Sequence, residues 1–256
     1  MTKSSHNRRR LLTLIALGLT TPRLAWSTEA DQDGLARELV ARADAIRFPQ
    51  ESFQTDITVR NFSNGEAGDV RKYRVLSRGN ENTIVLTMEP ASERGQALLM
   101  RGRDLWIFMP SVSQPVRLSL AQRLTGQVAN GDLARANFAG DYTPRLIGSE
   151  TVDGFPCHAL DLAAIDRGVT YARVKYWVRE DNTWPLKAEF YALSGRLLKT
   201  CRYLDFRELA GRERPTRLSL EDALKAGERS ELSYETMTLR ELPERMFTRE
   251  YLRRLG

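Results

Sequence analysis

The chain of 256 residues carries 39 basic and 33 acidic side chains but only two cysteines and two histidines, too few for a multi-histidine metal site or a typical zinc site. Its first 27 residues hold five of the basic residues and no acidic one, so the rest has 34 basic and 33 acidic residues and is nearly neutral. A near-neutral chain without a nucleic-acid-binding motif argues against a nucleic-acid partner.

The N-terminal segment predicts a cleavable export signal at residues 1–27. A basic stretch precedes "LLTLIALGLTT", which is too short to anchor the chain stably in a bilayer. Ala25 and Ser27 are small residues at the positions a signal peptidase reads, so cleavage is expected before Thr28. "NRRRLL" also fits the twin-arginine route, but we favour the Sec route. Residues 28–256 are therefore expected to form one exported domain.

Residues 30–47 predict an amphipathic helix. Leu35, Leu39, Ala43 and Ile46 recur at helical spacing with charged residues between them, and a proline soon follows.

From residue 53 onward the pattern is typical of antiparallel strands. Residues 53–62 alternate apolar and polar side chains, and "DVRKYRVLSRG", "NTIVLTM" and "GQALLMRGRDLWIFMP" follow at hairpin distance. After Pro144 further strand-like segments run to "ELSYETMTL", and "LPERMFTREYLRRL" predicts a linker and a short closing helix. About eleven strands predict one strongly curved antiparallel sheet, because wide sheets twist and tend to curl or close.

An unbroken apolar run at residues 105–109 predicts a strand that is covered on both faces. By alternation Trp106 and Phe108 share one face, while Leu105, Ile107 and Met109 share the other. The cover is either more protein or an apolar ligand, and alternation does not decide which face points inward.

Residues 119–140 interrupt the strands with two short helical patterns, the second of which Asn130 or Asp132 could cap. These helices would bury their apolar side in the hollow of the curved sheet. That side comprises Leu120, Leu124, Val128, Leu133 and Phe138.

The chemistry-bearing residues do not predict an enzyme. His158 is the only histidine outside the export signal, and the acidic pairs at 180–181 and 221–222 fall in turns or strand ends, where carboxylates are usually solvated. We expect no catalytic residues, no metal and no cofactor, with a hydrolase built from scattered carboxylates as an alternative. Cys157 and Cys201 lie in strand-like segments, and whether they form a disulfide is left open.

The order of these segments resembles the LolA-like outer-membrane lipoprotein-sorting proteins of Gram-negative bacteria, in a longer branch of that family. The resemblance spans about residues 30–255. It rests on "LWIFMP", "VRLS", "GDLARANFAGDY", "LIGSETVDGFPCHALDL", "YARVKYWV", "PLKAEFYALSGRLLKTCRY" and "MFTREYLRRL".

This resemblance implies a mainly β fold with short α-helices, a half-open antiparallel β-barrel lidded by helices as in LolA and LppX. Its cavity would hold acyl chains of lipoproteins or lipids. The expected cavity and lid residues are Leu105, Trp106, Phe108, Leu120, Leu124, Leu133 and Phe138. Arg103, Arg117 and Arg123 flank the apolar segments and are candidates for contact with lipid headgroups or a partner.

The resemblance also implies a monomeric carrier that receives cargo from an inner-membrane transporter and delivers it to an outer-membrane acceptor. The alternative is a lipid-binding accessory protein of an inner-membrane exporter of the resistance-nodulation-division type, handling a lipid that is not attached to protein.

Overall fold

The computed structural model describes residues 29–135 and 137–253, so the expected export signal lies outside the described residues. The first eight strands are β1 (Phe53–Ser63), β2 (Glu66–Arg78), β3 (Asn82–Glu89), β4 (Ala97–Arg101), β5 (Asp104–Phe108), β6 (Val116–Leu118), β7 (Arg123–Thr125) and β8 (Val128–Ala129). The later strands are β9 (Tyr142–Val152), β10 (Phe155–Ala164), β11 (Arg173–Arg179), β12 (Pro185–Tyr191), β13 (Leu197–Leu209), β14 (Arg212–Asp222) and β15 (Glu228–Leu239). The helices are α1 (Glu29–Arg47), α2 (Asn130–Ala134), α3 (Phe138–Asp141) and α4 (Arg249–Leu252), with 3-10 turns η1 (Ala91–Glu93) and η2 (Glu244–Met246).

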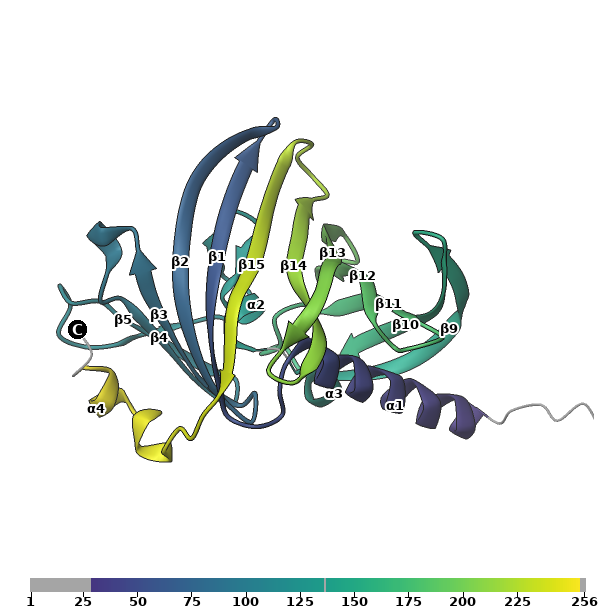
Figure 1. The fold of residues 1–256 in the computed structure, drawn as a ribbon, viewed down its shortest axis with the longest axis horizontal. Coiled ribbons are helices and arrows are strands. Elements are labelled where there is room, and N and C mark those ends of the chain that lie inside the picture. The colour runs from purple at the N-terminus through teal and green to yellow at the C-terminus, as the bar shows by residue number, and fades with distance from the viewer. Residues whose placement is uncertain (1–28, 136, 254–256) are drawn as a thin grey trace, which may run out of the picture.

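Within the described residues, thirteen strands form one antiparallel sheet in the order β6-β5-β4-β3-β2-β1-β15-β14-β13-β12-β11-β10-β9. The first and last long strands, β1 and β15, pair in its middle, with Phe53 opposite Leu239. The sheet curves strongly, and its edge strands β6 and β9 do not pair with each other (Figure 1). The expected half-open, mainly β architecture is confirmed.

The structure has more strands than the eleven or so expected. The additional ones are β6, β7 and β8, which contain only two or three residues each. Segments this short carry too little alternation to be recognised in a sequence.

Helix α1 confirms the helix expected at residues 30–47. Ala36, Leu39, Val40 and Ala43 are buried in the apolar cluster of the concave face, together with inward side chains of the sheet. Leu35, which was expected on the buried side, is instead exposed.

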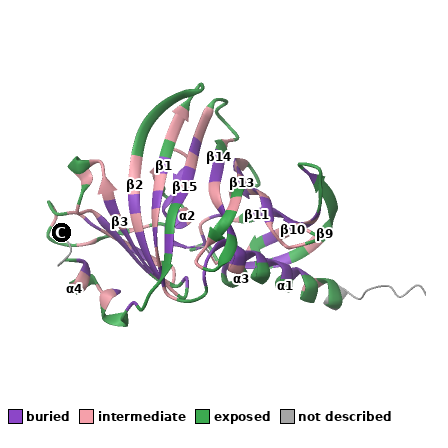
Figure 2. Ribbon diagram, in the orientation of Figure 1, coloured by how far each residue is buried: buried purple, intermediate pink, exposed green. Residues whose placement is uncertain are grey.

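The two faces of the sheet support separate apolar clusters. On the concave face Leu98, Met100 and Leu105 join the main core. On the outer face Leu99 and Phe108 join a smaller cluster with the segment that follows β15, whose contributions are Leu242, Phe247 and Leu252. Buried residues concentrate in the lower part of the strands, whereas the tip of the β1–β2 hairpin is exposed (Figure 2). Protein therefore covers the outer face of β5 and, at Leu105, its concave face.

The structure corrects the expectation of two helices at residues 119–140. Only α2 and α3 are helical, and residues 123–129 form the β7–β8 hairpin, whose turn contains Gly126 at φ +49°. The hairpin forms in place of a helix because hydrogen bonds from neighbouring strands hold this segment extended. The sequence pattern does not reveal these contacts.

Candidate functional site

Residues 119–141, called the lid below, fill part of the concave face of the sheet. They comprise β7, β8, α2 and α3. Leu120, Val128, Leu133 and Phe138 are buried in the same apolar cluster as α1 and the inward side chains of the strands. Burying an aliphatic or aromatic side chain of this size contributes about 1.5–3 kcal/mol. The lid thus covers apolar surface that would otherwise face water.

The β7–β8 hairpin of the lid is fastened to the middle of the sheet. Asn61 Nδ2 of β1 donates to Thr125 Oγ1 at 2.9 Å, and the Gln127 backbone N–H donates to Ser230 Oγ of β15 at 2.8 Å. Gly126 allows this approach, because a Cβ at that position would overlap the side chains of Asn61 and Ser230. Polar contacts therefore specify where the hairpin sits.

A buried ion pair ties α2 to the other half of the sheet. Lys199 Nζ donates to Asp132 Oδ2 and to the Gln127 carbonyl, each at 2.6 Å. Tyr171 Oη donates to the same carboxylate at 2.8 Å. Burial is the main reason that the pKa of Tyr171 lies well above its usual value, so this hydroxyl keeps its proton. Gly131 packs against Thr170 so closely that a Cβ there would overlap it.

A second buried ion pair lies at the C-terminal end of the lid, between the residue after α2 and the last residue of α3. Arg135 donates to both carboxylate oxygens of Asp141, at 2.5 and 2.8 Å, and to the Gly102 carbonyl at 2.9 Å. Arg103 donates to Asp141 at 3.1 Å and to Asp166 at 2.6 Å. Arg103 therefore braces α3 against the β10–β11 loop.

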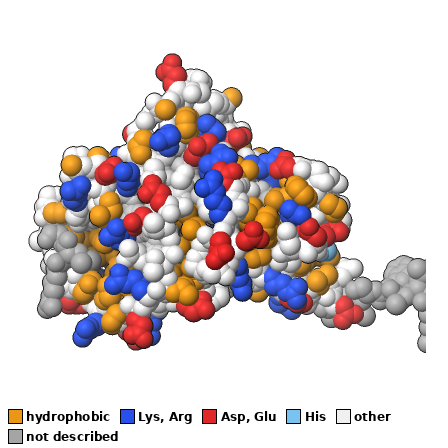
Figure 3. Space-filling view, in the orientation of Figure 1, with side chains coloured by type: hydrophobic (Ala, Val, Ile, Leu, Met, Phe, Trp, Pro, Cys, Tyr) orange, Lys and Arg blue, Asp and Glu red, His pale blue; other side chains and the backbone are white. Residues whose placement is uncertain are grey.

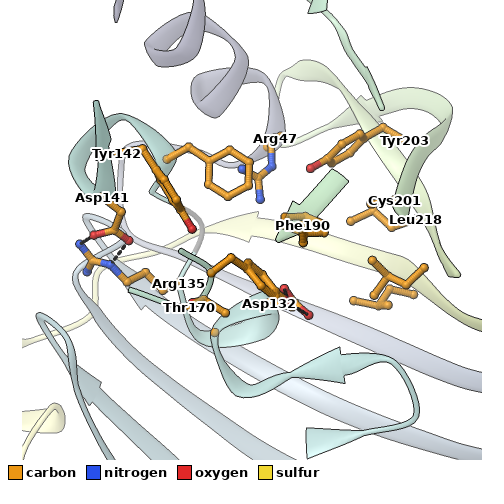
Figure 4. Close-up of a pocket in the computed structure, with 15 residues that line it drawn as sticks. Arg47, Asp132, Arg135, Asp141, Tyr142, Thr170, Phe190, Cys201, Tyr203 and Leu218 are labelled. Carbon is orange, nitrogen blue, oxygen red and sulfur yellow. Dashed lines mark hydrogen bonds and ion pairs between the residues drawn. The ribbon is translucent and has the colours of Figure 1, made fainter. Parts of the chain in front are cut away.

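Beneath the lid, Arg47 at the end of α1 points into a polar space among aromatic rings (Figure 4). Its guanidinium lies 4.2 Å from the centre of the Phe138 ring and pairs with Asp44 at 3.1 Å. Asp44 also accepts the Ala139 backbone N–H at 2.7 Å, which links α1 to α3. Burial raises the pKa of Asp44 to about 6. Arg47 Nε and Tyr176 Oη are buried without a hydrogen-bond partner among the described residues.

Cavities lie on both sides of the lid. One, of about 300 Å³, separates it from β2–β6 and is lined by Leu98, Ile107, Leu118 and Leu124 among others. Another, of about 450 Å³, lies between the lid and the β10–β13 side and is lined by Val169, Tyr171, Leu193 and Leu198 among others. The space under the lid around Arg47 is only about 30 Å³, which suits a single water molecule. The two cavities beside the closed lid are therefore large enough for part of a ligand, whereas the space beneath the lid is not.

The expected cavity residues of β5 divide between the two faces. Leu105 is fully buried on the concave side, and Ile107 lines the cavity beside it. Trp106 and Phe108 point outward and pack with Phe247 and Leu252 of the C-terminal segment, which corrects their expected placement. The reason is alternation along a strand, which allows only one set to face the lid.

The structure brings the expected lid residues together on the concave face. Leu120, Leu133 and Phe138 are buried under the lid, and Leu124 is partly buried and lines the 300 Å³ cavity. Of the three flanking arginines, Arg123 lines the 300 Å³ cavity and a smaller one of about 170 Å³, whereas Arg117 pairs with Asp104.

Sequence reasoning missed the buried charges that hold the lid. One signal was available, because Asp44 and Arg47 continue the buried stripe of α1 at helical spacing from Val40 and Ala43. Lys199 likewise alternates in register with the inward Cys201 and therefore faces the core.

The two cysteines are free. Cys201 lies in the concave core and Cys157 in a small cluster on the outer face, with β11 and β12 between their strands. Residues on opposite faces of a sheet and three strands apart cannot be bridged without moving the backbone. Burial raises the pKa of Cys201 to about 12, so it remains a thiol.

In residues 29–135 and 137–253, no cluster of three or more His, Cys, Asp or Glu side chains could hold a metal ion. No helix in that part of the chain has the length and apolar character needed to span a membrane. The face drawn in Figure 3 intersperses basic and acidic side chains, so it presents no large field of one sign.

A solved structure of a LolA superfamily protein from Nitrosomonas europaea is 58% identical and superimposes with a TM-score of 0.81, covering 84% of this chain and 98% of that one. The chain belongs to the LolA superfamily. A family model described as uncharacterized protein-like also matches residues 79–254. None of the curated proteins compared matches the sequence.

Two more distant structures share the LolA superfamily fold. A DUF1329 family protein from Desulfovibrio piger has a TM-score of 0.74 at 21% identity, covering 86% of this chain and 99% of that one. A protein domain from Vibrio parahaemolyticus, described as an outer-membrane lipoprotein-sorting domain, has a TM-score of 0.74 at 19% identity with the same coverage. At these identities the likeness concerns the fold alone.

Proposed function

We propose that this LolA superfamily protein is a periplasmic carrier that binds acyl chains of lipoproteins or lipids on the concave face of its sheet. The observation that carries the proposal is the lid, which fills this face with its own apolar side chains and leaves cavities of about 300 and 450 Å³ on either side. A surface that the protein covers with its own apolar side chains is suited to reversible binding of apolar cargo.

Binding and release follow from competition for the same surface. An acyl chain gains about 0.8 kcal/mol for each methylene that leaves water. Entry at full depth requires the lid to move, because only about 30 Å³ is free beneath it. When the lid closes again, Leu120, Leu133 and Phe138 cover the concave face and shield its apolar side chains from water. No covalent step is needed.

The buried polar contacts make the closed lid one defined state. Breaking the pair between Lys199 and Asp132, or between Arg135 and Asp141, leaves a charge buried without its partner, which costs several kcal/mol. The lid therefore opens only when cargo or a partner compensates for these contacts. Such a barrier suits a carrier that must hold its cargo while crossing water.

The cargo and route are proposed from the family. We propose outer-membrane lipoprotein sorting, with cargo received from an inner-membrane transporter and passed to an outer-membrane acceptor. The relative from Vibrio parahaemolyticus carries a lipoprotein-sorting description, which supports this choice. The alternative is an accessory protein of an inner-membrane exporter that handles free lipid.

Native mass spectrometry of protein purified from periplasm without detergent, followed by solvent extraction, tests the proposal. A stoichiometric acylated peptide or protein supports lipoprotein carriage, whereas a free lipid supports the exporter alternative. Protein that is empty and also fails to bind an added fluorescent fatty acid contradicts both. A variant with a weakened lid, Leu133→Asp, should retain bound lipid more tightly if the lid and the cargo compete for the concave face.

A further inference from the structure

Three loops at one end of β10–β15 form what we call the rim: residues 165–172, 192–196 and 223–227. They are neighbours, because the Ala172 N–H donates to the Tyr191 carbonyl at 3.1 Å and the Ala223 N–H donates to the Leu198 carbonyl at 3.0 Å. The β14–β15 loop lies at the upper end of Figure 1, away from α1 and α4.

The rim carries the most exposed large hydrophobic side chains among the residues that the structure describes. Leu193, Leu224 and Ile165 are 78%, 59% and 51% exposed, the three highest values among the large hydrophobic residues that the structure describes. Single exposed leucines are ordinary, but each of these lies in a different loop of the same end. Folding alone gives no reason to gather them there.

Each rim loop also carries one exposed cation: Arg167, Arg196 and Lys225. Two of the nearby acids, Asp166 and Asp222, have other partners, while Glu221 is exposed beside Asp222. Asp166 pairs with Arg103, and Asp222 accepts the backbone N–H groups of residues 224 and 225. Among the residues that the structure describes, neither Arg167 nor Arg196 forms an ion pair, and Lys225 pairs with Glu228 at an exposed site.

The rim opens onto the candidate site. Leu193 lines the 450 Å³ cavity, and Leu224 lines an adjoining one of about 170 Å³ that shares Ala121, Tyr171 and Leu198 with it. A lipid that leaves a bilayer at the rim therefore meets apolar walls next to the lid.

We propose that the rim docks on the surface of an anionic lipid bilayer, with its leucine and isoleucine tips in the interface and its cations at the headgroups. This inference extends the proposed carrier function by assigning the surface through which acyl cargo enters. Apolar side chains inserted in the interface and basic residues near anionic headgroups act together in membrane binding. Lys and Arg side chains are long enough to reach headgroups while their stems stay in apolar surroundings.

The test measures binding of the chain that remains after removal of the expected export signal. It compares anionic vesicles of mixed phosphatidylglycerol and phosphatidylcholine with vesicles of phosphatidylcholine alone. We expect binding to the anionic vesicles that weakens with salt. Leu193→Ser combined with Leu224→Ser should weaken it at least tenfold, and Arg167→Glu combined with Arg196→Glu should weaken it by a similar factor. Leu35→Ser combined with Leu239→Ser, which removes exposed leucines away from the rim, is the matched control and should leave binding unchanged.

A fluorescent fatty acid below its micelle concentration separates this inference from the proposed function. Arg196→Glu combined with Lys225→Glu, at rim residues that line neither the cavity of about 450 Å³ nor the adjoining one of about 170 Å³, should bind the free probe like the parent protein but take it more slowly from anionic vesicles. A parent protein that binds the probe yet ignores vesicles, or equal losses in rim and control variants, overturns the docking surface alone. Vesicle docking without any probe binding overturns the carrier function and leaves the docking surface standing.

Discussion

Lys199 Nζ on the concave face of β13 lies 2.6 Å from Asp132 Oδ2 in α2, and both side chains are almost fully buried. The pair joins the sheet to the lid at a point where little of either side chain reaches solvent. We therefore expect Lys199→Met to lower the free energy of unfolding by about 3 kcal/mol, since a carboxylate is left buried without its cation.

The same substitution should release the lid. Hydrogen exchange of amides in residues 122–134 should accelerate, and affinity for a fluorescent fatty acid should rise because the lid and the probe compete for one surface. Lys225→Met removes an exposed pair with Glu228 and is the control, with an expected cost below about 1 kcal/mol. Equal effects of the two substitutions would argue against a role for the buried pair.

Gly126→Ala tests the fastening of the lid hairpin. Gly126 has φ +49°, and a Cβ there would overlap Asn61 and Ser230. Gly65 in the β1–β2 hairpin has φ +85° but open space around it, so Gly65→Ala carries only the backbone cost of about 1–2 kcal/mol. We expect faster hydrogen exchange in residues 123–129 for Gly126→Ala alone. Unchanged exchange there would show that the hairpin contacts do not hold the lid.

Adjacent residues of β5 test which face binds cargo. Ile107 lines the cavity beside the lid, while Trp106 packs on the outer face with the C-terminal segment. Ile107→Asp should reduce retained lipid at least tenfold, because a charge would be desolvated beside an acyl chain. Trp106→Asp should lower the melting temperature but leave lipid retention unchanged. Native mass spectrometry of both variants gives the answer, and the reverse pattern would contradict this orientation.

Asp44 predicts a pH dependence of stability. Its pKa in the folded protein is about 6, above the usual 3.8, because burial disfavours its charge more than Arg47 and the backbone N–H groups of α3 favour it. The folded state therefore holds this proton more tightly than the unfolded chain. The contribution of Asp44 to the free energy of unfolding should fall by about 3 kcal/mol as pH rises from about 4 to 6, and then stay constant.

Urea unfolding of the parent protein and of Asp44→Asn at pH 4, 5, 6 and 7.5 isolates this contribution. Carboxylates with lowered pKa values, such as Glu189 and Asp205, act in the opposite direction in both proteins and cancel in the comparison. The difference between the two free energies should change over pH 4–6 and level off above it. A constant difference would show that Asp44 does not titrate in this range.

The cysteines should be present as two unreactive thiols. Cys157 and Cys201 are buried, and burial raises the pKa of each. We expect the native protein to react slowly with a thiol reagent such as dithionitrobenzoate and the urea-unfolded protein to release two equivalents. A protein that releases none after unfolding without reductant would contain the disulfide that the sheet geometry excludes.

The sequence alone determines the helix at residues 30–47, the long strands and the curved sheet. These features rest on periodicities of 3.6 and 2 residues, which are local and repeat over many positions. It also places Leu120, Leu133 and Phe138 in a shared apolar set, because an exposed set of this size would be unfavourable in water.

Contacts between distant segments determine the features that the local sequence pattern does not specify. The β7–β8 hairpin forms because β1 and β15 supply hydrogen-bond partners to residues that resemble a helix on their own. Trp106 faces outward because the C-terminal segment, more than 130 residues later in the chain, packs on that side. Lys199 meets Asp132 across 67 residues of sequence. Such pairings depend on which surfaces the folded chain brings together, and no periodicity within one segment records them.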